Sequence, residues 1–260
     1  MPPTTPIPSD GREMSHAAEV WATVSYQPLL REFFAGFVRF LVRRHFSRLT
    51  LVGPVPYLDP GLPWIFVANH ISWWDGFFLW SLQRKLAPQR RIYTVMLARE
   101  YVKLRWFRWI GGLPLEPSSS ASLRYLLRFV KDLGQNPQKP WILSFFPQGE
   151  IRPMATRPLL MRRGWQGLIK RDPQALVIPV ALHIEPGNER RPQVWIKIGS
   201  PLENHTTGET DPVQADPVQA DTNLGSRLEH LLHEINLEIS KAPTHQESGK
   251  ESSFAHTCLL

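Results

Sequence analysis

The sequence contains a polar turn, Asn69-His70-Ile71-Ser72-Trp73-Trp74-Asp75, between two apolar segments. The segment before it, residues 64–68, is short, apolar and rich in aromatic and β-branched side chains, which predicts a buried strand. The segment after it, residues 76–82, has the length and spacing of a helix. His70 is therefore expected at the C-terminal end of a strand, where α/β folds bind their ligands.

Asp75 follows His70 by five residues, near the first turn of the predicted helix. A tight turn can bring this carboxylate back to accept a hydrogen bond from one imidazole nitrogen. The other nitrogen is then left as a proton acceptor, as a general base requires. We therefore predict that His70 is a catalytic base oriented by Asp75. The alternative is a structural hydrogen bond, because His and Asp at this spacing also occur by chance.

A second polar segment, Ser144-Phe145-Phe146-Pro147-Gln148-Gly149-Glu150-Ile151-Arg152-Pro153, follows a β-like apolar run. Together the two segments resemble the blocks N-H-x4-D and F-P-E-G-T-R of the PlsC-type glycerolipid acyltransferases, also called lysophospholipid acyltransferases. Residues 111–117 are similar to the second block of that family, G-x-I-F-I-D-R, and residues 177–180 to its fourth, a hydrophobic strand with a proline. The four blocks lie in order within residues 60–185, so the chain resembles a divergent member.

This resemblance implies an O-acyltransferase that moves a fatty acyl group from acyl-CoA or acyl carrier protein to a lipid hydroxyl. The implied acceptor is a glycerolipid such as 1-acylglycerol-3-phosphate. Neither a metal nor a further cofactor is expected. By the same resemblance the third block binds the acceptor through Gln148, Gly149, Glu150 and Arg152, with Asn69 and Pro147 as supporting residues.

Several positions depart from the family pattern. Pro117 stands at the arginine position of the second block. In the third block Gln148 replaces Glu, Glu150 replaces Thr, and Ile151 replaces Arg, with Arg152 one place later. Each charge-assisted hydrogen bond lost with an arginine is worth about 1.5–3 kcal/mol, and a nearby carboxylate repels phosphate.

These departures leave more than one function open. Arg152 can compensate if the loop is rearranged, and the acceptor is then a phosphate. An acceptor without phosphate, such as a carotenoid glycoside or another glycolipid, is the first alternative. A non-catalytic membrane-binding protein is the second.

Composition and charge fit one α/β domain with appended segments, since the chain has 260 residues and is 42% hydrophobic. The net charge of +7 is unevenly distributed, with an excess of cations in residues 1–202 and of carboxylates in residues 203–260. A basic globular part indicates anionic partners such as lipid head groups. Residues 84–108 mix cations with aromatics, but no nucleic-acid-binding motif accompanies them, so no nucleic acid is expected as a partner.

The order of apolar segments predicts an α/β fold with a single domain. Strands that alternate with helices indicate a mixed, mostly parallel sheet flanked by helices, with an N-terminal amphipathic helical region and a C-terminal helix. Strands are predicted at residues 64–68, 91–97, 141–145, 176–182 and 193–198. Helices are predicted at residues 29–49, 98–110, 119–133, 164–171 and 224–239.

Residues 29–49 combine aromatic and aliphatic side chains at helical spacing with five arginines. The longest uncharged run is far below the ~20 residues that a membrane-spanning helix needs. A basic amphipathic helix suits an anionic membrane surface, and a helix packed on the core is the alternative. We expect a peripheral (monotopic) protein on the cytoplasmic face of a membrane. The expected segments are a disordered N-terminus (1–17), membrane-associating helices (18–49), a catalytic domain (50–202), a linker (203–222), a C-terminal helix (223–241) and a disordered tail (242–260).

Overall fold

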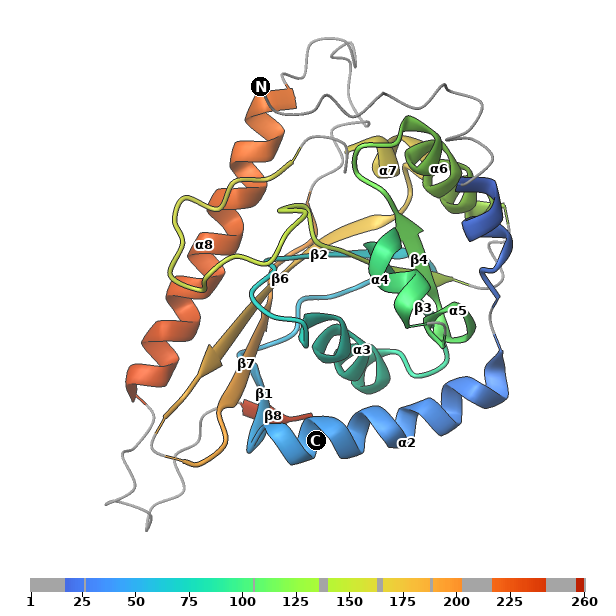
Figure 1. Cartoon of the computed structure of the whole chain (residues 1–260). Helices are drawn as coiled ribbons and strands as arrows, with labels where there is room; N and C mark the ends of the chain where they lie inside the picture. The colour runs from blue at the N-terminus through green and yellow to red at the C-terminus, as the bar shows by residue number, and fades with distance from the viewer. Residues whose placement is uncertain are drawn as a thin grey trace, which may run out of the picture.

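A computed structural model describes residues 17–25, 27–104, 106–135, 140–162, 166–187, 189–202, 217–241 and 256–259. Within these residues one eight-stranded sheet runs in the order β4-β3-β5-β2-β6-β7-β1-β8 (Figure 1). The strands are β1 (Arg48–Val52), β2 (Trp64–Ala68), β3 (Arg91–Leu97), β4 (Gly112–Leu115), β5 (Trp141–Phe145), β6 (Leu176–Glu185), β7 (Gln193–Ile198) and β8 (His256–Cys258).

The sheet is mixed and mostly parallel. Strands β4, β3, β5, β2 and β6 all run in the same direction, so their C-terminal ends meet at one edge. Strand β7 is antiparallel to β6, β1 is parallel to β7, and β8 is antiparallel to β1. This arrangement confirms the predicted α/β fold class.

Helices cover both faces of the sheet. They are α2 (Pro28–His45), α3 (Asp75–Leu86), α4 (Ala98–Lys103), α5 (Phe107–Ile110), α6 (Ser120–Gly134), α7 (Gln166–Arg171) and α8 (Pro217–Lys241). Helices α2 and α3 contribute to the hydrophobic cluster on one face, and α6, α7 and α8 to the cluster on the other (Figure 1).

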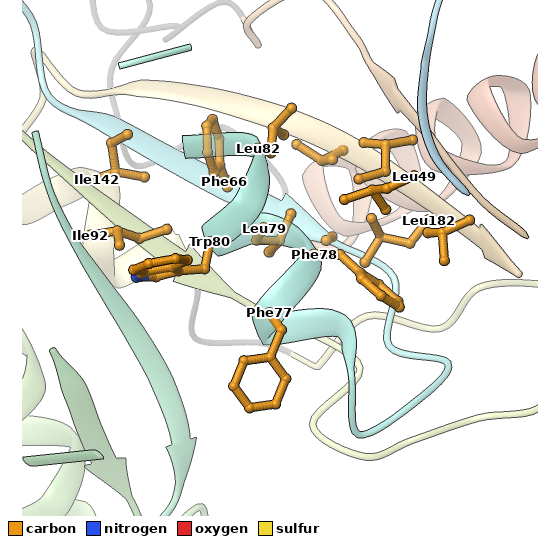
Figure 2. Packing of buried hydrophobic residues seen from close by; sticks show 14 of the residues in the cluster. Leu49, Phe66, Phe77, Phe78, Leu79, Trp80, Leu82, Ile92, Ile142 and Leu182 are labelled. Atoms are coloured by element: carbon orange, nitrogen blue, oxygen red, sulfur yellow. The ribbon is translucent and has the colours of Figure 1, made fainter. Parts of the chain in front are cut away.

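Strand β2 shows how one segment of the sequence supplies apolar side chains to both faces of the sheet. All five of its residues are buried, and side chains alternate between faces along a strand. Phe66 therefore joins the α3 side, whereas Ile65 and Val67 join the α6–α8 side. Figure 2 shows Leu79 of α3 in the same cluster as Phe66. A continuous apolar run is what a central parallel strand requires.

Several predicted elements agree with the structure, and others differ. Strands β2, β3, β5 and β7 have the predicted bounds, and Ser119 caps α6 by accepting a hydrogen bond from the Ser122 amide at 3.2 Å. The single helix predicted at residues 98–110 is divided into α4 and α5. Between them Trp106 packs on Phe34 of α2, with ring centroids 4.6 Å apart. This tertiary contact competes with a continuous helix.

The structure also differs from the predictions near the two ends of the described chain. The helix predicted at residues 29–49 ends at His45, and β1 begins at Arg48, because residues 49–52 are buried and residues 48–51 pair with β7. Part of the expected disordered tail forms β8, and the Leu259 amide donates to the Leu49 carbonyl at 2.8 Å. Helix α8 begins at Pro217, inside the expected linker. Residues 1–16, 203–216 and 242–255 lie outside the described residues.

Among the helices in the described residues, none combines the length and the apolar character needed to cross a bilayer.

Candidate active site

A cavity of about 1020 Å³ opens at the sheet edge where the parallel strands end. His70 lines it just beyond β2, and Phe146 and Pro147 line it just beyond β5. The ends of β3 and β4 contribute Leu97 and Leu115. This edge is where open α/β sheets bind ligands, and the cavity volume is at the upper end of the roughly 300–1,000 Å³ of small-molecule sites.

His70 and Asp75 form the predicted hydrogen bond, with Nδ1 of the imidazole 2.7 Å from Oδ2 of the carboxylate. Since an ionised carboxylate can only accept, Nδ1 of His70 carries the hydrogen. The Nε2 atom then holds a lone pair, and no hydrogen bond to it is found among the described residues. Asp75 is fully buried, whereas 22% of the His70 side chain remains exposed. The pair thus has the geometry of an oriented base.

The Asp75 carboxylate is held by three further donors. Its Oδ2 accepts from the amides of Ile71 and Ser72 at 2.7 and 2.9 Å, and its Oδ1 accepts from the Ser72 hydroxyl at 2.6 Å. Asp75 is also the first residue of α3, where the helix dipole favours a negative charge. Ser72 was not predicted as a site residue. The sequence did contain a signal for this contact, because a serine three residues before an aspartate that begins a helix can bond to its carboxylate.

Asn69 fixes the strand end from which His70 projects. Its side-chain amide donates to the Leu182 carbonyl at 2.9 Å, and its side-chain oxygen accepts from the Leu182 amide at 2.8 Å. Both bonds are buried and join the end of β2 to β6. Asn69 therefore ties the end of β2 to β6, and its supporting role in the reaction stays a prediction.

Gln148 lies in a different place from the acceptor contact that was expected. Its Oε1 accepts from the His70 amide at 2.6 Å, and the side chain is 94% buried behind the cavity wall. The bond holds the main chain of His70, so the geometry makes Gln148 a positioning residue rather than one that meets the acceptor. The neutral amide can replace the family's Glu here because an acceptor oxygen is all that this contact requires.

The third block wraps around His70. Phe146 stacks on the imidazole with centroids 4.5 Å apart, and the Arg152 amide donates to the His70 carbonyl at 2.9 Å. Gly149 has a φ of +72°, and a Cβ there would lie 2.8 Å from Cδ of Arg162. Glycine at 149 therefore permits both the turn and the approach of Arg162.

Three charged side chains meet beside this loop. Glu150 lines the cavity, pairs closely with Arg152, and lies 3.7 Å from Nη2 of Arg162. Arg162 also lines the cavity, whereas Arg152 is not among its lining residues. Arg162 was missed by the sequence analysis because contacts between distant segments bring it there, among them the hydrogen bond from its amide to the Pro147 carbonyl, 2.7 Å long. No sequence signal marks that contact.

The second block forms the opposite wall. Gly111 has a φ of +102°, and a Cβ there would lie 2.3 Å from the Ile92 carbonyl oxygen, so this position needs glycine. Glu116, Pro117 and Ser118 follow β4 and line the cavity. Pro117 offers no side-chain cation at this wall.

The rest of the lining is largely apolar. Aromatic side chains from α2, the Ser72–Asp75 turn, α3 and α5 contribute on one side, and aliphatic side chains of α6 and α7 contribute on the other. The aromatic members on these elements are Phe34, Trp73, Phe77, Trp80 and Phe107, and Phe145 and Phe146 at the end of β5 add two more. Such a lining favours a hydrocarbon chain by removing its apolar surface from water.

The shifted pKa values belong to groups outside this lining. Burial raises the pKa of Tyr93 and of Tyr101, and burial lowers the pKa of Arg90 to about 10. Arg90 stacks over Trp64 at 4.0 Å and donates to the Leu62 carbonyl. These three residues are buried in the fold and do not line the cavity.

Comparison with known proteins agrees with the motifs. Residues 52–182, half of the chain, match the acyltransferase family profile. Among solved structures, the crystal structure of the 1-acyl-sn-glycerophosphate (LPA) acyltransferase PlsC from Thermotoga maritima aligns with 90% of this chain and 97% of its own, at 16% identity and a TM-score of 0.47. A search of curated proteins found no significant match. The family predicted from the sequence blocks is thereby confirmed, and the chain belongs to the acyltransferase family of enzymes.

Proposed function

We propose that the protein transfers a fatty acyl group from a thioester donor, acyl-CoA or acyl carrier protein, to a lipid hydroxyl, with His70 as general base. The observation that carries this proposal is the orientation of His70, which binds Asp75 through Nδ1 and lines the cavity. The apolar part of that cavity supports an acyl chain as the transferred group.

The reaction needs one proton acceptor. The acceptor oxygen attacks the thioester carbonyl carbon while its proton moves to Nε2 of His70. Asp75 keeps the imidazole in the required tautomer and stabilises the imidazolium that forms. The C–O bond forms, the C–S bond breaks, and His70 returns the proton to the departing thiolate.

Direct transfer without an acyl-enzyme fits the positions of Cys258 and Ser72. Cys258 lies on the edge strand β8, which is separated from β2 by β6, β7 and β1. The Ser72 hydroxyl donates to Asp75 and has a positioning role.

The experiment is an acylation assay with labelled acyl-CoA and, separately, labelled acyl carrier protein. Lipid acceptors that carry a free hydroxyl are offered in mixed micelles. His70→Ala should lower kcat by about 10²–10⁴-fold, the usual contribution of a general base. His230→Ala is the matched control, since His230 is exposed on α8 and does not line the cavity. Unchanged product formation by His70→Ala would refute the role of His70.

We also propose that α2 docks the enzyme on an anionic membrane. Its inner face, with Val38 and Val42, is buried in the core, but Leu29, Phe33 and Phe40 are exposed on the opposite side. Exposed apolar side chains that form one stripe of a helix mark an interaction surface. We call Leu29, Leu30, Phe33, Phe37 and Phe40 the α2 outer stripe.

The chemistry of the neighbouring residues favours lipid as the partner of the α2 outer stripe. Arg39, Arg43 and Arg44 are exposed on the same helix and can meet lipid phosphates. Phe34 of α2 and the half-exposed Trp73 line the cavity, so its apolar end lies beside α2. A lipid acceptor could therefore enter from the bilayer without crossing water.

A further inference from the structure

The lining of the cavity carries more carboxylates than cations. Among the described residues its cations are Arg99 and Arg162, and its carboxylates are Glu100, Glu116 and Glu150. The protein as a whole is basic, with a net charge of +7. The excess of positive charge on the chain is therefore not found in the described lining.

Both lining arginines already face carboxylates. Arg162 lies 3.7 Å from Glu150, and Arg99 lies 3.5 Å from Glu100. Arg152 lies in the same loop as Glu150 but does not line the cavity, and it pairs closely with Glu150. An incoming anion would have to compete with these carboxylates for each guanidinium.

Glu150 also lies at a point that the fold fixes relative to His70. Two residues earlier, the Gln148 side chain accepts from the His70 amide, and two residues later the Arg152 amide donates to the His70 carbonyl. The Glu150 backbone is thus held between two links to the catalytic residue proposed above. A ligand bound at the Glu150–Arg162 pair lies at the rim of the site where the reaction is proposed to occur.

We propose that the acceptor has an uncharged head group with several hydroxyls, such as glycerol or a sugar, and that Glu150 and Arg162 bind these hydroxyls. This inference rests on the proposed acyl transfer. A hydroxyl can donate to the Glu150 carboxylate and accept from the Arg162 guanidinium, so it satisfies both groups without separating them. A phosphomonoester carries a charge of about −1.5 to −2 at pH 7 and is repelled by the carboxylates.

The test uses two acceptors that differ only in the phosphate. 1-Monoacylglycerol and 1-acylglycerol-3-phosphate with the same acyl chain are compared in the same micelles, with the donor held constant. We expect kcat/KM for the uncharged acceptor to exceed that for the phosphate by at least about tenfold. A monoglycosyl lipid is tested in parallel and should also be acylated.

Variants of the pair then test the cause of the preference. Glu150→Gln should shift the ratio of the two kcat/KM values toward the phosphate by about tenfold, because it removes the repelling charge. Arg162→Gln should raise KM for the uncharged acceptor and should not improve the phosphate. Glu234→Gln is the control, because Glu234 is a partly exposed carboxylate of α8 that pairs with Lys197 of β7, outside the cavity lining. It should leave the ratio unchanged, and melting temperatures verify that each variant is folded.

The outcomes separate the two proposals. Product formed only from the phosphate acceptor, or a ratio that Glu150→Gln does not change, overturns the uncharged head group while acyl transfer stands. If no acceptor that carries a hydroxyl is acylated, the proposed acyl transfer is overturned, and the inferred head group is overturned as well.

Discussion

The amide of His70 donates a hydrogen bond to the side-chain oxygen of Gln148 across 2.6 Å. This bond joins the first and third sequence blocks, which lie 78 residues apart in the chain. It holds the main chain of His70, while Asp75 orients its side chain. The position of the imidazole thus depends on a residue that does not line the cavity.

Replacement of Gln148 should test this positioning role. Gln148→Leu leaves the partly buried His70 amide without its acceptor, which costs about 1–3 kcal/mol, and we expect kcat to fall at least tenfold. Gln148→Glu keeps an acceptor oxygen and should retain most of the activity. The measurement is kcat and KM for the donor together with the melting temperature. A Gln148→Leu enzyme with native kcat would contradict the role.

Gly111 should tolerate no side chain. Gly111→Ala combines a left-handed φ of +102° with a Cβ 2.3 Å from the Ile92 carbonyl oxygen. We expect a loss of at least about 3 kcal/mol, or roughly 6–12 °C in the melting temperature of a domain of this size. Gly36→Ala is the matched control, since nothing lies within 4 Å of its added Cβ. Equal melting temperatures for the two variants would show that the main chain at Gly111 does not pack closely against the Ile92 carbonyl.

The α2 outer stripe should be needed for membrane binding and not for folding. Phe33 and Phe40 are 79% and 62% exposed, so Phe33→Ser with Phe40→Ser should leave the melting temperature unchanged. Binding to vesicles that contain anionic lipid, measured by co-sedimentation at low salt, should weaken at least tenfold, since burial of one Phe is worth about 1.5–3 kcal/mol. Leu237→Ser on α8 is the control, because Leu237 is exposed away from α2. Equal vesicle binding by the native protein and the double variant would refute the docking surface.

Asp172 should make stability depend on pH. Burial raises the pKa of its carboxyl above the ordinary value of 3.8. The folded protein therefore binds this proton more tightly than the unfolded chain, and the stability so gained is lost as the pH rises through the folded pKa. Asp172→Asn should consequently melt at a higher temperature than the native protein at neutral pH.

The same comparison has an internal check. The advantage of Asp172→Asn should shrink below the unfolded pKa of 3.8, where both side chains are neutral. Thermal melts across this range measure it, with Asp132→Asn on the exposed side of α6 as the control. A lower melting temperature for Asp172→Asn at neutral pH would mean that the carboxylate makes favourable contacts that outweigh its burial.

Much of this protein was determined by the sequence itself. Short segments rich in apolar and β-branched side chains predict β2, β3, β5 and β7 with their observed bounds. Strand β2 is apolar throughout, because a central parallel strand with both faces covered must be apolar at nearly every position. The spacing of His70 and Asp75 predicts their hydrogen bond, since a turn of five residues closes locally. Local geometry and burial are properties of short segments, so a single sequence suffices to read them.

The tertiary structure decided what depends on distant partners. Strands β1 and β8 are short and form because each meets a strand edge supplied elsewhere in the chain. Gln148 faces the His70 amide and Arg162 reaches Glu150 only after the strand ends and loops have been brought together. Contacts between distant segments are set by the packing of the sheet, and for this reason the acceptor side of the cavity could not be assigned from the motifs alone.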